Sequence, residues 1–213
     1  AVCKVTATGS NLERAFPNVW ADHSGITFKP ADKPKVFEVT VAPNVPPGPH
    51  LVRFFNAEGA SVPHVFVIGT HDEIEDAEQN EDFTRSQPVA KLPVTLNGRL
   101  EKSGDVDTFA VKLEAGRTFV ADLQGYALGS QMDPAMKLLD AQGVEVALSH
   151  DTHNLDPRIT FAVTKTGTYH VQLMAFAHPP AADVTLKGSA AHIYRLTLTD
   201  QPFAFAAQPC AVQ

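Results

Sequence analysis

The stretch GDVDTFAVKLEAGRTFVADL, residues 104–123, decides the fold of the second half of the chain. Apolar and polar residues alternate on both sides of the turn sequence Glu114-Ala115-Gly116, and successive side chains of a β-strand point to opposite faces. The apolar residues of each strand therefore share one face, formed by Phe109, Val111 and Leu113 in the first strand and by Phe119, Ala121 and Leu123 in the second. The pattern predicts two neighbouring strands that turn one face to a hydrophobic core.

Strand patterns of the same kind continue through the second half of the chain. They cover residues 106–113, 117–125, 135–140, 144–149, 158–163, 168–175 and 193–199. Turn sequences such as Ala141-Gln142-Gly143 and Lys165-Thr166-Gly167 separate several of them, and helical periodicity is almost absent. The sequence therefore predicts an all-β protein whose second half is a jelly-roll-like β-sandwich.

The first half has a similar but less regular pattern. Strands are expected at residues 2–8, 35–43, 50–55 and 62–68, with a turn at Pro46-Pro47-Gly48-Pro49. These strands favour an immunoglobulin-like β-sandwich. Trp20 falls in the irregular part of this half, where packing is the favoured interpretation and a binding contact the alternative.

Length and composition set the domain organisation. A chain of 213 residues leaves room for two small β domains, each with its own core. We expect an immunoglobulin-like domain at 1–70, an acidic linker at 71–90, a β-sandwich at 91–200 and a tail at 201–213. Hydrophobic residues make up 44% and charged residues 19%, which is typical of a globular protein rather than a disordered one. No apolar run reaches the roughly 18–20 residues of a membrane helix, so no membrane insertion is expected.

The expected linker carries most of the charge imbalance of the chain. Seven acidic residues and no Lys or Arg lie between Asp72 and Asp82. The net charge is -7, so the rest of the chain is formally neutral. No basic patch is evident, and nucleic acid is therefore not an expected partner.

The two cysteines, Cys3 and Cys210, lie near opposite ends of the chain. Their spacing does not match a zinc site. They form either a disulfide that ties the tail to the first strand or two separate thiols, and export of the chain would favour the disulfide.

A series of short motifs follows the acidic segment in a fixed order. They are Glu78-Gln79-Asn80-Glu81, Leu96-Asn97-Gly98-Arg99-Leu100, Gly104-Asp105-Val106-Asp107-Thr108-Phe109, Gly167-Thr168-Tyr169-His170-Val171 and Tyr194-Arg195-Leu196. In order and spacing, residues 73–200 resemble the bacterial pre-peptidase C-terminal (PPC) domain, which occurs on many secreted proteins beside peptidases. The first half resembles IPT/TIG-type immunoglobulin-like domains through Gly9-Ser10-Asn11-Leu12 and the 46–49 turn.

The PPC resemblance implies a calcium site where the acidic segment meets the sandwich. The positions that match ligands of the family are Asp76, Glu78, Asn80, Glu81, Asp105 and Asp107. Carboxylate and amide oxygens are the ligands that Ca²⁺ prefers. Asp76, Gln79 and Glu81 depart from the family pattern, which often has Glu, Pro and Asp at these positions. The alternative is a solvated acidic linker in which Asp105 and Asp107 only accept hydrogen bonds from turn amides.

The most enzyme-like cluster is His150-Asp151-Thr152-His153, in an expected loop with Asp156 nearby. Two imidazoles and a carboxylate are typical of zinc sites and of proton transfer, but loop decoration is the favoured interpretation. No HExxH, GxSxG or phosphate-binding glycine motif is present. The sequence therefore predicts a protein that is not an enzyme.

Three functions remain open. The favoured one is a calcium-dependent binding or adhesion module of a larger secreted bacterial protein, with a protein or polysaccharide surface as partner. The second is a structural spacer stiffened by calcium, and the third is a hydrolase with a site near His150 and His153. The resemblance implies a secreted, periplasmic or cell-surface location, and we expect the chain to be a piece of a longer precursor whose other domains are its partners.

Overall fold

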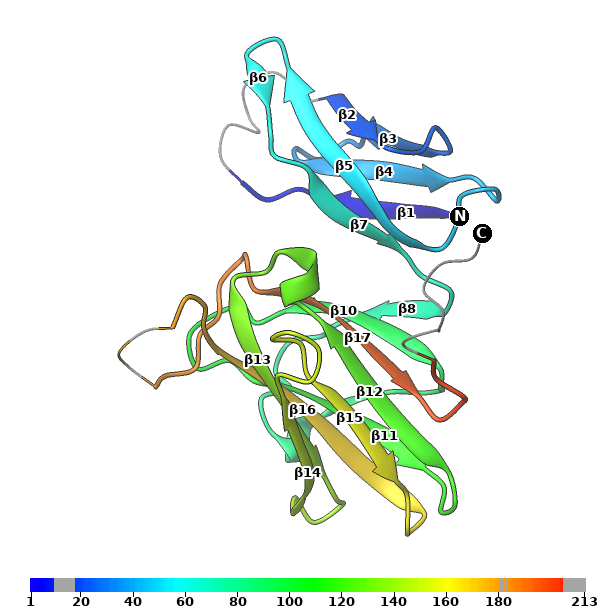
Figure 1. Cartoon of the computed structure of the whole chain (residues 1–213), viewed down its shortest axis with the longest axis vertical. Coiled ribbons are helices and arrows are strands. Elements are labelled where there is room, and N and C mark those ends of the chain that lie inside the picture. Colours follow the sequence, from blue (N-terminus) through cyan, green and yellow to red (C-terminus); the bar gives the residue numbers. More distant parts are fainter. Residues whose placement is uncertain (10–17, 181, 183, 205–213) are drawn as a thin grey trace, which may run out of the picture. The chain divides into compact units, whose positions relative to one another are not determined.

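The computed structural model describes residues 1–9, 18–180, 182 and 184–204 (Figure 1). The chain divides into two compact units, Ala1–Thr70 and His71–Gln213. Nearly all regular elements are strands, and the helical segments of the described residues are two short 3-10 turns, η1 (Phe83–Arg85) and η2 (Tyr126–Leu128). Neither turn is long enough or apolar enough to cross a bilayer. The prediction of an all-β protein is confirmed.

Unit 1 consists of two antiparallel sheets. The first has the order β1-β4-β3, and in the second β5 pairs with β2 along one side and with β6 and β7 along the other. The strands are β1 (Val2–Thr6), β2 (Asn18–Ala21), β3 (Ile26–Pro30), β4 (Val36–Val41), β5 (Gly48–Asn56), β6 (Gly59–Ala60) and β7 (His64–Ile68). The two sheets form a sandwich, and its finer assignment as immunoglobulin-like stays a prediction.

Aromatic side chains from both sheets form the core of unit 1. The rings of Phe37 and Phe54 lie 5.5 Å apart and those of Phe28 and Phe66 lie 5.6 Å apart, so each pair connects the first sheet to the second. Trp20 is not part of this core, because its neighbours Val19 and Ala21 in β2 face inward and strand alternation turns Trp20 outward. Its side chain is 50% exposed, which corrects the favoured interpretation of Trp20 as a packing residue.

Unit 2 is a sandwich of two five-stranded sheets with the orders β15-β12-β17-β10-β8 and β14-β13-β16-β11-β9 (Figure 1). The strands of the first sheet are β8 (Asp72–Glu75), β10 (Val94–Arg99), β12 (Thr118–Gln124), β15 (Arg158–Ala162) and β17 (Ile193–Thr199). Those of the second are β9 (Gln87–Pro88), β11 (Asp107–Leu113), β13 (Met132–Leu139), β14 (Glu145–His150) and β16 (Gly167–Ala177). All seven strands expected from alternation in this half are present.

The inward faces of these strands build one continuous core. Phe109, Phe119, Val171 and Leu196 have no exposed surface, and they come from four strands in both sheets. The facing apolar residues predicted from alternation are therefore confirmed as core. Burial of this surface is the main favourable contribution to folding of the unit.

Three strands of unit 2 were not predicted. β8 and β9 lie within residues 71–90, which we expected to be an acidic linker, and they pair in parallel with β10 and β11. The third is β10, whose Asn97-Gly98 pair is typical of a turn. Here Asn97 and Gly98 instead lie opposite Arg195 and Tyr194 of β17 in an antiparallel ladder.

One edge of the second sheet is formed by β14. Val144, Val146 and Leu148 are exposed there, although they are large and apolar. The pairing of β14 with β13 shifts by one residue, because Leu138 lies opposite Ala147 and Leu139 lies opposite Glu145. Val146 is therefore the extra residue of a β-bulge.

Of the two cysteines, Cys3 belongs to the described residues. Cys3 is exposed on β1, and Cys210 lies outside the described residues. The disulfide between them therefore stays a prediction. The start of the tail packs on unit 2, where the Arg158 guanidinium lies 5.3 Å from the centre of the Phe203 ring.

The buried core predicts an unequal response to two leucine truncations in unit 2. Leu196→Ala should lower the free energy of unfolding by about 2–5 kcal/mol, because Leu196 has no exposed surface and its loss leaves a cavity. The matched change Leu148→Ala should cost less than about 0.5 kcal/mol, because 53% of Leu148 is exposed. Urea unfolding of both variants measures the difference, and equal losses would contradict this description of the core.

Candidate cation site

Backbone pairing brings the acidic segment beside the start of β11. β8 runs parallel to β10, and just beyond its last residue Asp76 N donates to Asn97 O over 2.9 Å. The chain then continues through Glu78 and Asn80. Asp105 lies at the end of the loop that follows β10, and Asp107 is the first residue of β11. The two segments on which the sequence analysis placed the ligands are thus neighbours in space.

Three carboxylates converge at this point. Asp76, Glu78 and Asp107 each have an oxygen within 4.8 Å of an oxygen of the other two. Asp107 is fully buried, Asp76 is half-buried and Glu78 is exposed. Among the described residues this is the one group of acidic, His or Cys side chains close enough to share a metal ion.

The two buried aspartates share a distinctive hydrogen-bond pattern. Asp107 Oδ2 accepts a hydrogen bond from the Tyr194 hydroxyl over 2.6 Å, and Asp105 Oδ2 accepts one from the Glu101 backbone N–H. The second oxygen of each, Oδ1, is buried and has no hydrogen-bond partner. Buried polar atoms are nearly always paired, so two half-satisfied carboxylates side by side require an explanation.

Asn80 repeats this pattern with an amide. Its Nδ2 donates to Asp76 Oδ1 over 3.0 Å, and its Oδ1 is buried without a partner. The protein therefore fixes one polar atom of Asn80, Asp105 and Asp107 and leaves one oxygen of each available. Leaving such an oxygen unpaired costs about 1–3 kcal/mol, which a bound cation would recover.

The electrostatics of the cluster disfavour its charged form. Burial raises the pKa of Asp107 to about 8, and the nearby Asp76 charge adds to this rise. Burial also raises the pKa of Asp76 to about 6, against the hydrogen bond from Asn80, which lowers it. Burial also raises the pKa of Glu78, and the negative charge of Asp105 adds to this rise. A cation would reverse this balance, because it favours the ionised carboxylates.

Gly98 allows the tyrosine to reach the cluster. A Cβ atom at position 98 would lie 2.5 Å from Tyr194 Cζ and 2.7 Å from Asp76 Cβ, so only glycine fits between them. This role was not predicted, because Gly98 and Tyr194 entered the prediction only as parts of two short motifs. The glycine in a strand was the available signal, since it often marks a close approach.

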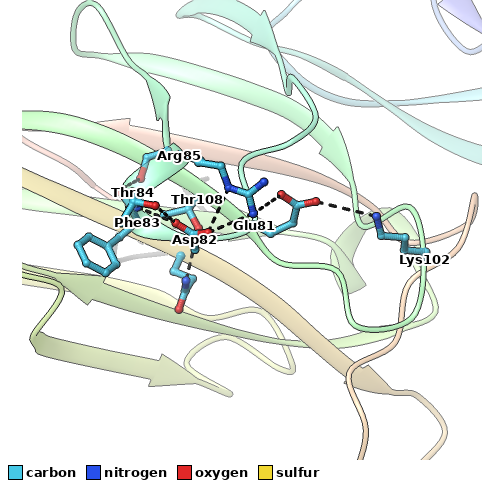
Figure 2. Close-up of polar contacts among 9 residues, drawn as sticks. Glu81, Asp82, Phe83, Thr84, Arg85, Lys102 and Thr108 are labelled. Atoms are coloured by element: carbon cyan, nitrogen blue, oxygen red, sulfur yellow. Dashed lines mark hydrogen bonds and ion pairs between the residues drawn. The ribbon is translucent and has the colours of Figure 1, made fainter.

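Glu81 does not join the three carboxylates. Figure 2 shows it between Arg85 and Lys102, with ion-pair distances of 3.3 Å from Oε2 to Arg85 Nη2 and 4.0 Å from Oε1 to Lys102 Nζ. The next residue, Asp82, caps η1 by accepting a hydrogen bond from Thr84 N over 2.8 Å. Of the six expected ligands, Asp76, Glu78 and Asp107 come together, and Asn80 contacts Asp76. In addition to burial, the charge of Asp105 raises the pKa of all three carboxyl groups.

The histidine loop is arranged differently. His150 Nδ1 lies 3.1 Å from the adjacent Asp151 carboxylate, and both side chains are exposed. His153 pairs through its backbone with Asp156. The buried Asp156 carboxylate accepts hydrogen bonds from the three backbone N–H groups of residues 125–127, so it is not available as a third ligand.

The residues of the acidic cluster fit a hard divalent cation. All the side-chain atoms that remain available are carboxylate or amide oxygens, and neither sulfur nor imidazole lies among them. This donor chemistry suits Ca²⁺ and Mg²⁺ rather than Zn²⁺ or Cu²⁺.

Part of the chain is similar to a known protein. No family model matches the chain. A probable subtilase-type serine protease of Deinococcus radiodurans is 29% identical over 102 residues, which is 47% of this chain and 14% of the protease. This chain thus matches only a small part of that relative.

Two solved structures resemble parts of the chain at low identity. The PPC domain of a Bacillus anthracis collagenase is 12% identical, with a TM-score of 0.37, over 63% of this chain and 99% of that domain. The Bacteroides ovatus protein SGBP-B of a mixed-linkage glucan utilization locus, in complex with a heptasaccharide, is 8% identical, with a TM-score of 0.26, over 92% of this chain and 70% of that one. Neither score is high enough to place the chain in a family.

The acidic cluster predicts that removal of one charge stabilises the metal-free protein. Asp107→Asn keeps an oxygen for the Tyr194 hydroxyl and adds an N–H group next to the other carboxylates. In chelator at pH 8, this variant should gain on the order of 1 kcal/mol, or about 2–4 °C in Tm for a chain of this size. Glu75→Gln, an exposed charge removal in the same acidic segment, should change Tm little. A lower Tm for Asp107→Asn would show that the charge of Asp107 does not destabilise the metal-free protein.

Proposed function

We propose that this chain is a non-catalytic, calcium-dependent binding or adhesion module of a larger secreted bacterial protein. The observation that carries the calcium part is the set of buried oxygens without partners in Asn80, Asp105 and Asp107, beside the converging carboxylates of Asp76 and Glu78. A bound Ca²⁺ would supply the positive charge that this set lacks. The buried Oε2 of Glu81 also has no hydrogen-bond partner, but Glu81 is left outside the proposed set because its carboxylate forms ion pairs with two cationic side chains and does not join the converging carboxylates.

Calcium suits the proposed ligands better than magnesium does. Ca²⁺ takes about six to eight oxygens at roughly 2.3–2.6 Å and tolerates irregular geometry, whereas Mg²⁺ requires near-octahedral geometry and gives up its water reluctantly. The proposed ligands come from two backbone segments and include a long Glu side chain beside shorter Asp and Asn side chains. Such a set adapts more readily to the larger ion.

The binding part of the proposal rests on the outward face of β2 and β5 in unit 1. Trp20, Leu51 and Phe55 are each between 41% and 50% exposed, and Arg53 lies directly opposite Trp20 in the register. Exposed aromatic and apolar residues gathered on one sheet face are typical of contact surfaces. We propose a protein or polysaccharide surface as the partner.

The setting in a larger protein is also part of the proposal. The Deinococcus radiodurans relative is described as a protease, and this chain covers only 14% of its length, which favours an accessory role outside a cell. The favoured location is therefore secreted, periplasmic or at the cell surface. No catalytic role is proposed for His150 and His153, whose nearest candidate third ligand is engaged elsewhere.

A structural spacer is the second candidate, and the position of the cation site favours it. β8 begins directly after the boundary between the units, and Asp76 follows its last residue. An ion held there would fix the first segment of unit 2 after the boundary. This candidate predicts calcium binding without any macromolecular partner.

Calcium should raise the melting temperature of chelator-treated protein. At a hundredfold excess over Kd the gain is about 2.7 kcal/mol, and magnesium at the same concentration should give a smaller one. The double variant Asn80→Ala with Asp105→Ala should lose the response and stay folded, because neither residue belongs to the apolar core. The matched control, Asn44→Ala with Asp32→Ala, makes the same chemical change at exposed sites of unit 1. Calorimetry that detects no binding at millimolar calcium would refute the calcium site.

The proposed contact surface can be tested on glycan and protein arrays. The intact chain in calcium should be retained on a partner, and Trp20→Ala should reduce that retention at least about tenfold, as truncation of a central aromatic contact does. Leu148→Ala, which removes an exposed apolar side chain from unit 2, is the control and should leave retention unchanged. Calcium binding without retention on any array would favour the spacer.

A further inference from the structure

His50 joins two connections in unit 1, far in sequence from the cation site. Its Nδ1 lies 2.9 Å from Asp22 Oδ1, and its Nε2 lies 2.9 Å from the Pro46 carbonyl oxygen. Asp22 follows β2 in the turn to β3, and Pro46 belongs to the loop from β4 to β5. Both connections cross from one sheet of the sandwich to the other, so His50 lies where the two crossings meet.

The two contacts of His50 require two protons. A carboxylate and a backbone carbonyl are acceptors only, so each ring nitrogen must donate an N–H group. A neutral imidazole carries one N–H, and its other nitrogen would then direct a lone pair at an oxygen 2.9 Å away. The geometry therefore assigns the imidazolium form to His50.

Asp22 is itself fixed to β5. Its Oδ2 accepts a hydrogen bond from Leu51 N over 2.8 Å, and its backbone N–H donates to Leu51 O over 3.0 Å. The carboxylate thus holds the strand through one oxygen and the imidazolium through the other. The other contact of the imidazolium is with the Pro46 carbonyl oxygen of the β4–β5 loop.

The loop packs closely on the turn that it faces. A Cβ atom at Gly25 would lie 2.7 Å from Val45 Cγ2, and Ala42 N donates to Gly25 O over 2.9 Å. Val45 is buried in the core of unit 1. Movement of the loop away from the turn would therefore also expose part of the core.

Few other ionisable groups face His50. The ring of His23 lies edge-on, 6.1 Å away between ring centres, and its Nδ1 accepts a hydrogen bond from Gly25 N. On β7, Phe66 lies opposite His50, and His64 lies opposite Val52 on the same side of the sheet. Residues 42–49 carry no ionisable side chain. The charge state of this region therefore depends mainly on Asp22 and His50.

We propose that His50 is a pH-sensitive clamp: its imidazolium holds the β4–β5 loop against the β2–β3 turn, and loss of one proton releases the loop. Deprotonation leaves one N–H for two acceptors, so either the Pro46 contact or the Asp22 contact is lost. The Asp22 carboxylate is charged and is held in place by the Leu51 N–H, so it keeps its hydrogen bond to His50. The hydrogen bond to the Pro46 carbonyl is therefore the one that is lost, and the loop is released.

The pH range of the clamp follows from the two partners. The hydrogen bond to Pro46 and then the one to Asp22 raise the pKa of His50 above its usual 6.5. The hydrogen bond from the Leu51 N–H, and then the hydrogen bond and the charge of His50, lower the pKa of Asp22 below its usual 3.8. The stability from His50 is fully present below pH 6.5 and is lost as pH rises through its raised pKa, while that from Asp22 is lost only as pH falls through its lowered pKa. The clamp is closed between these limits.

Nitrogen-15 NMR on the intact chain tests the proposal. At pH 6.5, where an ordinary histidine is about half deprotonated, both ring nitrogens of His50 should still carry hydrogen. On titration to pH 9, the protection factor of the Ala42 amide, which donates to Gly25 O across the loop and the turn, should fall by about tenfold for each unit by which the pKa of His50 exceeds its usual value. Protection factors correct for the faster intrinsic exchange at high pH. A titration at or below 6.5, or constant Ala42 protection up to pH 9, would overturn the clamp.

Two variants and a control separate the clamp from a general effect of pH. In His50→Gln, Ala42 protection should be low and independent of pH between 5.5 and 9. In Asp22→Asn, the midpoint of the His50 titration should move toward its usual value, because the carboxylate no longer stabilises the imidazolium. His64→Gln, an exposed histidine on the neighbouring strand, should retain the wild-type transition. Loss of the transition in His64→Gln, or its persistence in His50→Gln, would assign the effect to another group and overturn the proposal.

Discussion

The hydrogen bond from Tyr194 to Asp107 connects the hydrophobic core of unit 2 with its charged cluster. The tyrosine ring is buried among the apolar residues of both sheets, while its hydroxyl reaches a carboxylate that has no exposed surface. The position of Asp107 is thus fixed by the packing of the sandwich rather than by the loop before it. Asp76 and Asn80 are then placed around it by the pairing of β8 with β10.

Ion pairs with basic residues from other parts of unit 2 explain why the acidic segment is folded. A run of like charges without basic partners would ordinarily stay solvated and extended. Here Glu73 forms a bidentate ion pair with Arg195 of β17, and Lys91 pairs with Asp72, so the first residues of the segment are held on the sheet. Asp76 and Glu78, which follow these residues along the chain, then lie beside Asp107 in the cluster. The sandwich therefore stabilises a concentration of negative charge that the segment alone would disperse.

Much of the fold could be predicted from the sequence, because alternation is a local property. The strands around Phe109 and Phe119 are recognisable from their own residues, and their inward faces follow from the period of two. The edge pairings of β8 and β9 could not be found in this way, since their side chains give no alternating pattern and their partners lie further along the chain. The role of Gly98 could not be predicted for a related reason, because the residue that requires a glycine there is Tyr194, which is distant in the sequence.

The candidate site was predictable in composition but not in detail. The family resemblance pointed to the residues that converge, yet the separation of Glu81 from them depends on Arg85 and Lys102, whose positions no local pattern specifies. The unpaired oxygen atoms are likewise a property of three-dimensional contacts. In unit 1, the outward position of Trp20 follows from the parity of β2, but that strand was not expected and its parity was unknown.

The bulge in β14 limits edge-to-edge association between copies of this molecule. An edge strand with exposed Val and Leu side chains is a ready template for another strand, and such templates lead to uncontrolled sheet growth. Val146, the extra residue, interrupts the regular hydrogen-bonding frame near the start of the strand and bends it there. A second chain paired with the residues after the bulge could not extend its ladder back past that point in register. The molecule thus displays an apolar stripe at its margin while resisting polymerisation along it.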